Sequence, residues 1–257
     1  MASFELQKAY FDDLCRRAML ARPGTEDSGI GTLGEKRMHA IIKRFLCDDT
    51  ACHEVRLEGT RFVSDVRIGN HVFEVQTGDF YPMRKKIDYY LNRTDCTVTV
   101  LHPISVKRWM SWVDPQSMEV QPRRRVGNIG KPADLLVQLA ALEPFLQHPR
   151  LHFRLLLLET YDFRLLDGVS SDRKKRATHY ERIPLSLMGD LSFDSAKDFQ
   201  SLIPETLPET FTAKIFSTHS KLRSRDAYLA IRALAALGLI VPTDPIGKAR
   251  AWKATDF

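Results

Sequence analysis

The sequence has few cysteines and no pattern that would make them metal ligands. Its four cysteines, Cys15, Cys47, Cys52 and Cys96, form no CxxC pair and have no histidine partner at the spacing of a zinc site. A zinc centre is therefore not expected. We predict that the four residues are buried thiols of an intracellular protein.

Long hydrophobic runs are also missing. The first twenty residues, MASFELQKAYFDDLCRRAML, are amphipathic and charged throughout, so they lack the apolar core of a signal peptide, and we expect a helix over 4–20. No later run is long enough to span a bilayer. We therefore expect a soluble, cytoplasmic protein with no membrane partner.

The charge balance favours positive residues. Among 257 residues, 38 are Lys or Arg and 32 are Asp or Glu, which gives a formal net charge of +6. This length is enough to bury a full core and favours one larger domain with a small one. The surplus of positive charge indicates attraction to polyanions but does not separate nucleic acid from a membrane surface.

Two carboxylates stand in unusual positions between residues 61 and 77, RFVSDVRIGNHVFEVQT. Asp65 and Glu74 each lie within a β-patterned run, and Gly69-Asn70 between the runs predicts a tight hairpin turn. A carboxylate among apolar neighbours is costly unless a cation pairs with it. A divalent metal would do so, and Glu35, at the edge of the apolar stripe of a helix expected over 33–46, is a candidate third ligand. Hard oxygen ligands of this kind suit magnesium.

The order of the expected elements adds a second indication. A helix with Glu35 precedes three short strands, and the third strand carries Glu74-Val75-Gln76. A helix over 81–92 and a strand over 96–101 follow. This arrangement resembles the PD-(D/E)xK nuclease superfamily over residues 33–101. The resemblance implies an α/β fold with a restriction-endonuclease-like mixed sheet flanked by helices.

The resemblance also implies roles for individual residues. Asp65, Glu74 and the main-chain carbonyl of Val75 would hold Mg²⁺, for which Mn²⁺ is expected to substitute, and Glu35 matches the additional helical acid of many members. Two residues depart from the motif: Ser64 replaces its proline, and Gln76 replaces its lysine. Glutamine can position a water by hydrogen bonding but adds no positive charge. Lys36, His39 and Lys43 are candidates for the missing cation or proton relay.

The middle of the chain is expected to extend this nuclease-like domain. We predict a strand over 107–113, a basic loop from Arg123, a helix over 132–146, a strand pair over 151–166 and a short helix over 194–202. The segment IPETLPET that follows, with its two prolines, is a candidate linker. The expected domains are therefore residues 1–203, with a core at about 31–102 and an extension at 103–203, and residues 209–257.

The carboxyl-terminal domain resembles a winged helix-turn-helix, which commonly places its second helix in the major groove of DNA. A short helix near Ala213 and a longer helix over 224–237 precede a hairpin. Ser224 is the expected N-cap of the longer helix, and Gly238 is expected to end it. Tyr228 and Leu229 are assigned to the core-facing side of the longer helix. The residues expected to contact nucleic acid are Lys221, Arg223, Arg225, Arg232, Lys248 and Arg250.

The leading hypothesis is a magnesium-dependent endonuclease that cleaves DNA, with Asp65 and Glu74 as primary ligands, Glu35 as an auxiliary ligand and Gln76 positioning the water. Two alternatives stay open. One is a non-catalytic DNA-binding regulator on a decayed nuclease fold. The other is an interaction protein that contacts a protein partner through the winged helix. A homodimer is compatible with paired cuts, although no coiled-coil pattern indicates one.

Overall fold

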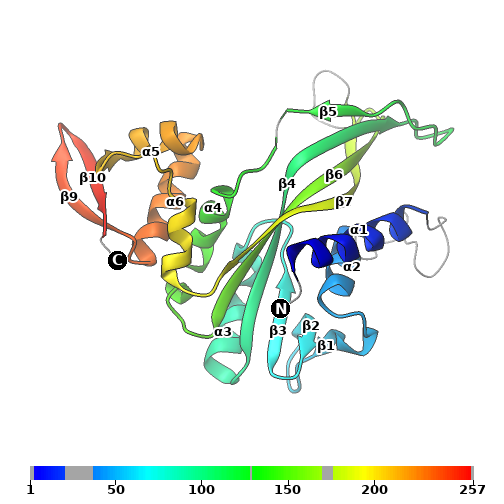
Figure 1. The fold of residues 1–257 in the computed structure, drawn as a ribbon, viewed down its shortest axis with the longest axis horizontal. Helices are drawn as coiled ribbons and strands as arrows, with labels where there is room; N and C mark the ends of the chain where they lie inside the picture. The colour runs from blue at the N-terminus through cyan, green and yellow to red at the C-terminus, as the bar shows by residue number, and fades with distance from the viewer. Residues whose placement is uncertain (1–2, 21–36, 128, 170–175, 256–257) are drawn as a thin grey trace. The chain divides into compact units, whose positions relative to one another are not determined.

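The chain folds into a mixed α/β structure, which we describe from a computed structural model for residues 3–20, 37–127, 129–169 and 176–255 (Figure 1). A large mixed sheet is flanked by helices. The sheet has seven strands in the order β1-β2-β3-β4-β6-β7, with β5 paired to β4. Its strands are β1 (His53–Arg56), β2 (Val63–Ile68), β3 (His71–Val75), β4 (Thr97–Val113), β5 (Arg124–Val126), β6 (Leu151–Leu165) and β7 (Thr178–Phe193).

The remaining elements are mostly helical. The helices before the carboxyl-terminal region are α1 (Phe4–Leu20), α2 (Arg37–Leu46), α3 (Arg84–Arg93) and α4 (Asp134–Leu139). Four short 3₁₀ helices are η1 (Thr50–Cys52), η2 (Tyr81–Met83), η3 (Ala140–Phe145) and η4 (Ala196–Leu202). Across the described residues, no helix is both long and apolar enough to cross a membrane.

The chain forms two compact units, each built from three segments. Unit 1 contains Met1–His53, Pro103–Gly130 and Leu156–Asp190, and unit 2 contains Glu54–His102, Lys131–Leu155 and Leu191–Phe257. The expected linker at 203–210 lies inside unit 2. The long strands β4, β6 and β7 contribute residues to both units.

In unit 1, α1 is fixed to β7 by polar contacts as well as by its apolar face. The carboxylate of Asp12 accepts hydrogen bonds from the Leu187 main-chain N–H at 2.9 Å and from the Ser186 hydroxyl at 3.0 Å. On the buried side of α1, the ring of Phe11 packs edge-on against Phe45 of α2, with ring centroids 5.1 Å apart. The amphipathic pattern of the sequence predicted both bounds of α1, because its apolar residues recur at helical spacing.

Four predictions from the middle of the chain were wrong. The basic loop expected from Arg123 begins with a short strand, β5, because Arg124 and Val126 pair with Met110 and Arg108 of β4. The strands expected over 96–101 and 107–113 form one strand, β4. It runs through Pro103 because the pairing with β3 ends at Leu101, so that no donor from Pro103 is needed on that side. The strand pair expected over 151–166 is the single strand β6. The helix expected over 132–146 changes to 3₁₀ geometry after residue 139, and Leu142 has non-helical φ/ψ two residues before Pro144.

The cysteine prediction holds for two residues. Cys15 and Cys96 are buried, whereas Cys47 and Cys52 are half-buried, and all four are free thiols. Burial raises the pKa of the Cys15 thiol well above its usual range.

The carboxyl-terminal part of unit 2 is a helix pair followed by a hairpin. It consists of β8 (Thr210–Thr212), α5 (Ala213–Ser220), α6 (Ser224–Ala236), β9 (Ile240–Ile246) and β10 (Ala249–Ala254), and the strand order is β8-β10-β9. Gly238 ends α6 with a φ of +76°, a left-handed conformation that glycine adopts without strain. The N-cap position of α6 is Arg223 rather than Ser224. Tyr228, which we had assigned to the core, is 58% exposed.

Arg150 fastens the segment between α3 and β4 in unit 2 by three hydrogen bonds. Its guanidinium donates hydrogen bonds to the carbonyl oxygens of Leu91 at 2.5 Å and of Thr94 and Cys96 at 2.8 Å each. These carbonyls lie at the end of α3 and at the approach to β4. One side chain therefore fixes where α3 ends relative to the strand that follows it.

Replacing this guanidinium should destabilise unit 2. We expect Arg150→Met to lower the free energy of unfolding by roughly 3 kcal/mol, because it leaves several carbonyls without a charged donor. Urea denaturation followed by circular dichroism measures the change. Arg93→Met, at an exposed position in the last turn of α3, is the matched control and should shift the value by less than about 0.5 kcal/mol. Equal effects of the two changes would contradict this role of Arg150.

Candidate functional site

The β2–β3 hairpin brings the two candidate carboxylates onto one face of the sheet. The strands are antiparallel, with Val66 opposite Phe73 and Arg67 opposite Val72. Continuing this register places Asp65 opposite Glu74, and residues directly opposite each other point to the same face. Asp65 is held there by its Oδ2 atom, which accepts a hydrogen bond from the Val75 main-chain N–H at 2.7 Å.

Helix α3 supplies two partners to Glu74 that the sequence analysis did not identify. The Lys86 ammonium lies 2.5 Å from Oε2 of Glu74, and the Tyr90 hydroxyl donates a hydrogen bond to Oε1 at 2.9 Å. Lys86 and Tyr90 are four residues apart, so they lie on one face of α3. That spacing was the available signal, but a lysine and a tyrosine on a helix are too common to indicate a site.

Glu74 is an acid in an unfavourable place for its charged form. Only 6% of its side chain is exposed, and this burial raises its pKa to about 7. The nearby Asp65 carboxylate raises the pKa further, whereas Lys86 and Tyr90 lower it. The ion pair with Lys86 therefore offsets only part of the cost of burying the Glu74 carboxylate.

Gln76, the residue at the position of the motif lysine, is anchored within its own loop. Its side-chain amide donates a hydrogen bond to the Asp79 carbonyl at 2.6 Å, and its main-chain N–H donates one to Leu101 at 2.8 Å. The buried His102 contacts the Gln76 carbonyl through Nδ1 at 2.6 Å. The main chain on both sides of Val75, itself buried, is thus fixed by hydrogen bonds.

Among the described residues, two of the predicted carboxylate ligands, Asp65 and Glu74, are available to hold magnesium. Glu35, the expected third acid, and Lys36 lie outside the described residues. Within those residues, no group of three or more His, Cys, Asp and Glu side chains is placed to hold a metal ion. Magnesium is often held by one or two carboxylates together with waters, so Asp65 and Glu74 fit it. The other candidate cations, His39 and Lys43, lie on α2 in unit 1, half-buried and buried respectively.

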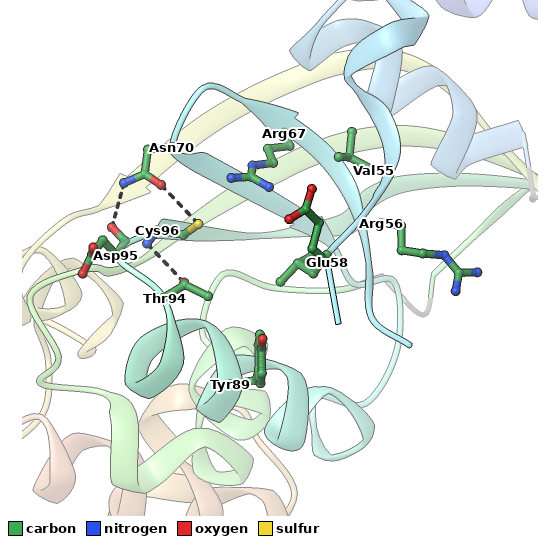
Figure 2. Close-up of a pocket in the computed structure, with 10 residues that line it drawn as sticks. Val55, Arg56, Glu58, Arg67, Asn70, Tyr89, Thr94, Asp95 and Cys96 are labelled. Carbon is green, nitrogen blue, oxygen red and sulfur yellow. Dashed lines mark hydrogen bonds between the residues drawn. The ribbon is translucent and has the colours of Figure 1, made fainter. Parts of the chain in front are cut away.

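A cavity of about 650 Å³ lies elsewhere in unit 2 (Figure 2). Asn70 at the β2–β3 turn and Cys96 just before β4 line it, so it lies at the end where the parallel strands β3 and β4 begin, away from Glu74. Arg67 and Glu58 point toward one another across it, whereas Arg56 points away (Figure 2). None of the residues predicted for metal binding lines this cavity.

The residues predicted to contact nucleic acid fall into two groups. Arg225, Lys248 and Arg250 are exposed, and a bulge between Ala249 and Ala251 interrupts the β9–β10 register at Arg250. The others make contacts within unit 2. Arg223 pairs with Asp226 at 2.7 Å, Arg232 pairs with Glu143, and the Lys221 carbonyl accepts a hydrogen bond from Lys131 at 2.9 Å.

The burial of Glu74 should make stability depend on pH when no metal is present. Its folded-state pKa of about 7 lies above the ordinary value of 4.5, so the folded state holds its proton more tightly than the unfolded state. The associated stability is complete below about pH 4.5 and is lost as pH rises to about 7. The loss is at most roughly 3 kcal/mol. Urea titrations in EDTA across this range measure it.

Glu74→Gln should remove this pH dependence, since an amide does not titrate. Glu209→Gln changes an exposed acid and is the matched control, which should keep the wild-type profile. A Glu74→Gln profile that parallels the wild type would show that another group carries the effect.

Comparison with known proteins gives one match. A family described as "Domain of unknown function (DUF8091)" matches residues 36–194, which is more than half of the chain. The matched range includes Asp65, Glu74, Gln76 and Lys86 and ends before α5 and α6. No curated protein and no solved structure matches the chain. The chain therefore belongs to the DUF8091 family.

Proposed function

We propose that the chain is a magnesium-dependent nuclease that hydrolyses phosphodiester bonds in DNA. The observation that carries this proposal is the placement of Asp65 and Glu74 on one face of the β2–β3 hairpin, with the Lys86 ammonium 2.5 Å from Glu74. Paired carboxylates beside a lysine are the groups that metal-assisted phosphodiester hydrolysis requires.

Each side chain has a separate task in this proposal. Asp65 and Glu74, with the Val75 carbonyl, hold the magnesium. The ion, when bound, lowers the pKa of a water and offsets negative charge on the phosphate. Lys86 supplies the positive charge that Gln76 lacks, and Tyr90 orients Glu74 by its hydrogen bond. Gln76 contributes by fixing the main chain next to Val75.

The arrangement of the elements supports a restriction-endonuclease-like fold. Strand β2 is antiparallel to β3, β3 is parallel to β4, and α3 connects the parallel pair. This succession of a hairpin, a helix and a parallel strand is the one that the sequence resemblance implies. It also explains why the two acids come from adjacent antiparallel strands.

The carboxyl-terminal region supports docking on DNA. A strand, two helices and a hairpin with the order β8-β10-β9 are the parts of a winged helix. Arg225, Tyr228 and Arg232 recur at helical spacing along the exposed side of α6. In this proposal α6 enters the major groove, and Lys248 and Arg250 of the hairpin contact phosphates.

One observation favours the alternative of a non-catalytic DNA-binding regulator. Both carboxylate oxygens of Glu74 have a partner within the chain, Lys86 at one and Tyr90 at the other. A remnant of a nuclease site would keep such internal contacts after losing its metal. The regulator would bind DNA in a salt-sensitive way and yield no metal-dependent product.

A cleavage assay with labelled DNA tests the proposal directly. We expect Lys86→Met to lower magnesium-dependent cleavage on the order of 100-fold, because it removes a charge placed to stabilise the transition state. Lys85→Met, at the exposed neighbouring position, should cleave like the wild type. Asp65→Asn is the inactive control, since it should abolish cleavage and retain DNA affinity. Wild-type cleavage by Asp65→Asn, in preparations free of other nucleases, would refute the mechanism.

Binding to a DNA duplex tests the docking role separately. We expect Arg250→Gln to weaken binding in EDTA and to lower the salt slope of the affinity by about one, as the loss of one phosphate contact predicts. Fluorescence anisotropy at several salt concentrations measures both quantities. Lys197→Gln removes an exposed charge on η4 of the same unit and serves as the control. Equal salt slopes for wild type and Arg250→Gln would argue for a winged helix that contacts protein.

A further inference from the structure

Unit 1 contains a cluster of three arginines around a single carboxylate, which we call the arginine cluster. Arg182 of β7 forms a two-point contact with Asp162 of β6, with Nε 2.5 Å from Oδ1 and Nη2 2.9 Å from Oδ2. Arg108 of β4 lies 3.7 Å from the same carboxylate, within ion-pair but not hydrogen-bond distance. Only 2% of the Asp162 side chain is exposed.

Arg164 is the third member and has no partner of opposite charge. It follows Asp162 by two residues on β6, so its side chain points to the same face of the strand. Within the described chain, Arg164 makes no hydrogen bond or ion pair, and the Nε atoms of Arg164 and Arg108 are buried without an acceptor. Arg164 and Arg182 lower the pKa of Arg108, in addition to the effect of its burial.

Within the described residues, the cluster carries more positive charge than its acidic neighbours balance. Arg108 and Arg182 share the Asp162 carboxylate, and Arg164 lies beside them without an acidic partner there, which leaves a surplus of two positive charges. Leaving a half-buried guanidinium without an acceptor is costly. An anion that accepts hydrogen bonds from Arg164 and Arg108 would remove this cost.

The positive charge continues onto the edge strand β5. Arg124 lies over the ring of Trp112 with its guanidinium carbon 4.2 Å from the ring centroid, and Arg124 pairs with Met110 in the β4–β5 register. Met110 follows Arg108 by two residues, so Arg108, Met110 and Trp112 share one face of β4. On the other face, Arg123 lies over the ring of Trp109 at 4.7 Å.

Stacking on a tryptophan prepares an arginine for binding phosphate. It fixes the plane of the guanidinium while its N–H groups remain free to donate in that plane, which is the geometry of a two-point contact with a phosphate. The rings of Trp109 and Trp112 each carry an arginine on one face. On the face of β4 that carries Arg108, Trp112 is thus covered by Arg124, so this face is suited to a phosphate backbone more than to stacked bases and should bind without sequence preference.

We propose that the arginine cluster, together with Arg124, binds phosphate groups of a nucleic-acid backbone. A free phosphate ion would satisfy the cluster alone, but Arg124, stacked on Trp112 on the same face of β4, extends the positive surface onto β5, since neighbouring strands are about 4.8 Å apart. A polymer of phosphates uses this whole surface. The proposal shares with the proposed function the assumption that nucleic acid is the partner, but it concerns binding in unit 1 and not cleavage.

Arg164→Gln tests the inference, because the substitution breaks no hydrogen bond or ion pair with the residues that the structure describes. Binding of labelled single-stranded and duplex DNA and RNA is measured by fluorescence anisotropy in EDTA at several salt concentrations. We expect the Kd of Arg164→Gln to rise about fivefold or more and its salt slope to fall by about one. The melting temperature should stay unchanged or rise, since the substitution removes repulsion among the arginines. Arg16→Gln, at an exposed position on α1 in the same unit, should bind like the wild type.

The possible results separate this inference from the proposed function. Wild-type affinity and salt slope in Arg164→Gln would overturn the inference, even if the protein cleaves DNA. Weakened binding by this variant would support it, even if no cleavage occurs. Wild-type protein that binds only inorganic phosphate, or only vesicles rich in phosphatidylserine, would overturn it in favour of those ligands. A lower melting temperature in Arg164→Gln, with unchanged binding, would assign the cluster a structural role.

Discussion

The contact between Glu74 and helix α3 is the interaction on which the candidate site depends. A buried carboxylate at the end of β3 would destabilise the hairpin by itself, and Lys86 and Tyr90 make it tolerable. The same contact fixes α3 above the sheet face that carries Asp65. The packing of α3 on the sheet and the placement of the two carboxylates therefore depend on the same contacts. A substitution that disturbs one of them disturbs the other.

The sequence predicted the short, regular elements of this fold well. The bounds of α1 and the β2–β3 hairpin follow from local patterns, a helical apolar period in one case and a Gly-Asn turn between β runs in the other. Gly238 likewise marks the end of α6 because few other residues adopt its left-handed conformation. In each case the decisive information lies within a few residues of the element itself.

The errors share a different cause, which is that the deciding contacts are distant in sequence. Pro103 indicated a break, yet β4 continues through it because neighbouring strands pair on both sides of it. Lys86 has no local feature that marks it as the partner of Glu74, since that contact exists only after α3 packs on the sheet. Tyr228 fits the apolar stripe of α6 by spacing, but it lies at the edge of that stripe and remains exposed. The type of a residue and the spacing of apolar residues along the chain are not enough to predict the environment of these three side chains.

The contact of Arg150 with the end of α3 has a consequence for how the site assembles during synthesis. Arg150 hydrogen-bonds carbonyls of residues 91, 94 and 96, so the helix that carries Lys86 and Tyr90 is secured by a residue more than fifty positions downstream. Asp65, Glu74, Lys86 and Tyr90 all leave the ribosome before that residue does. During synthesis, the β2–β3 hairpin and α3 are therefore present before Arg150 can form its hydrogen bonds to the end of α3. A protein cut short before residue 150 would contain every member of the acidic site but lack the side chain that joins the end of α3 to the approach to β4.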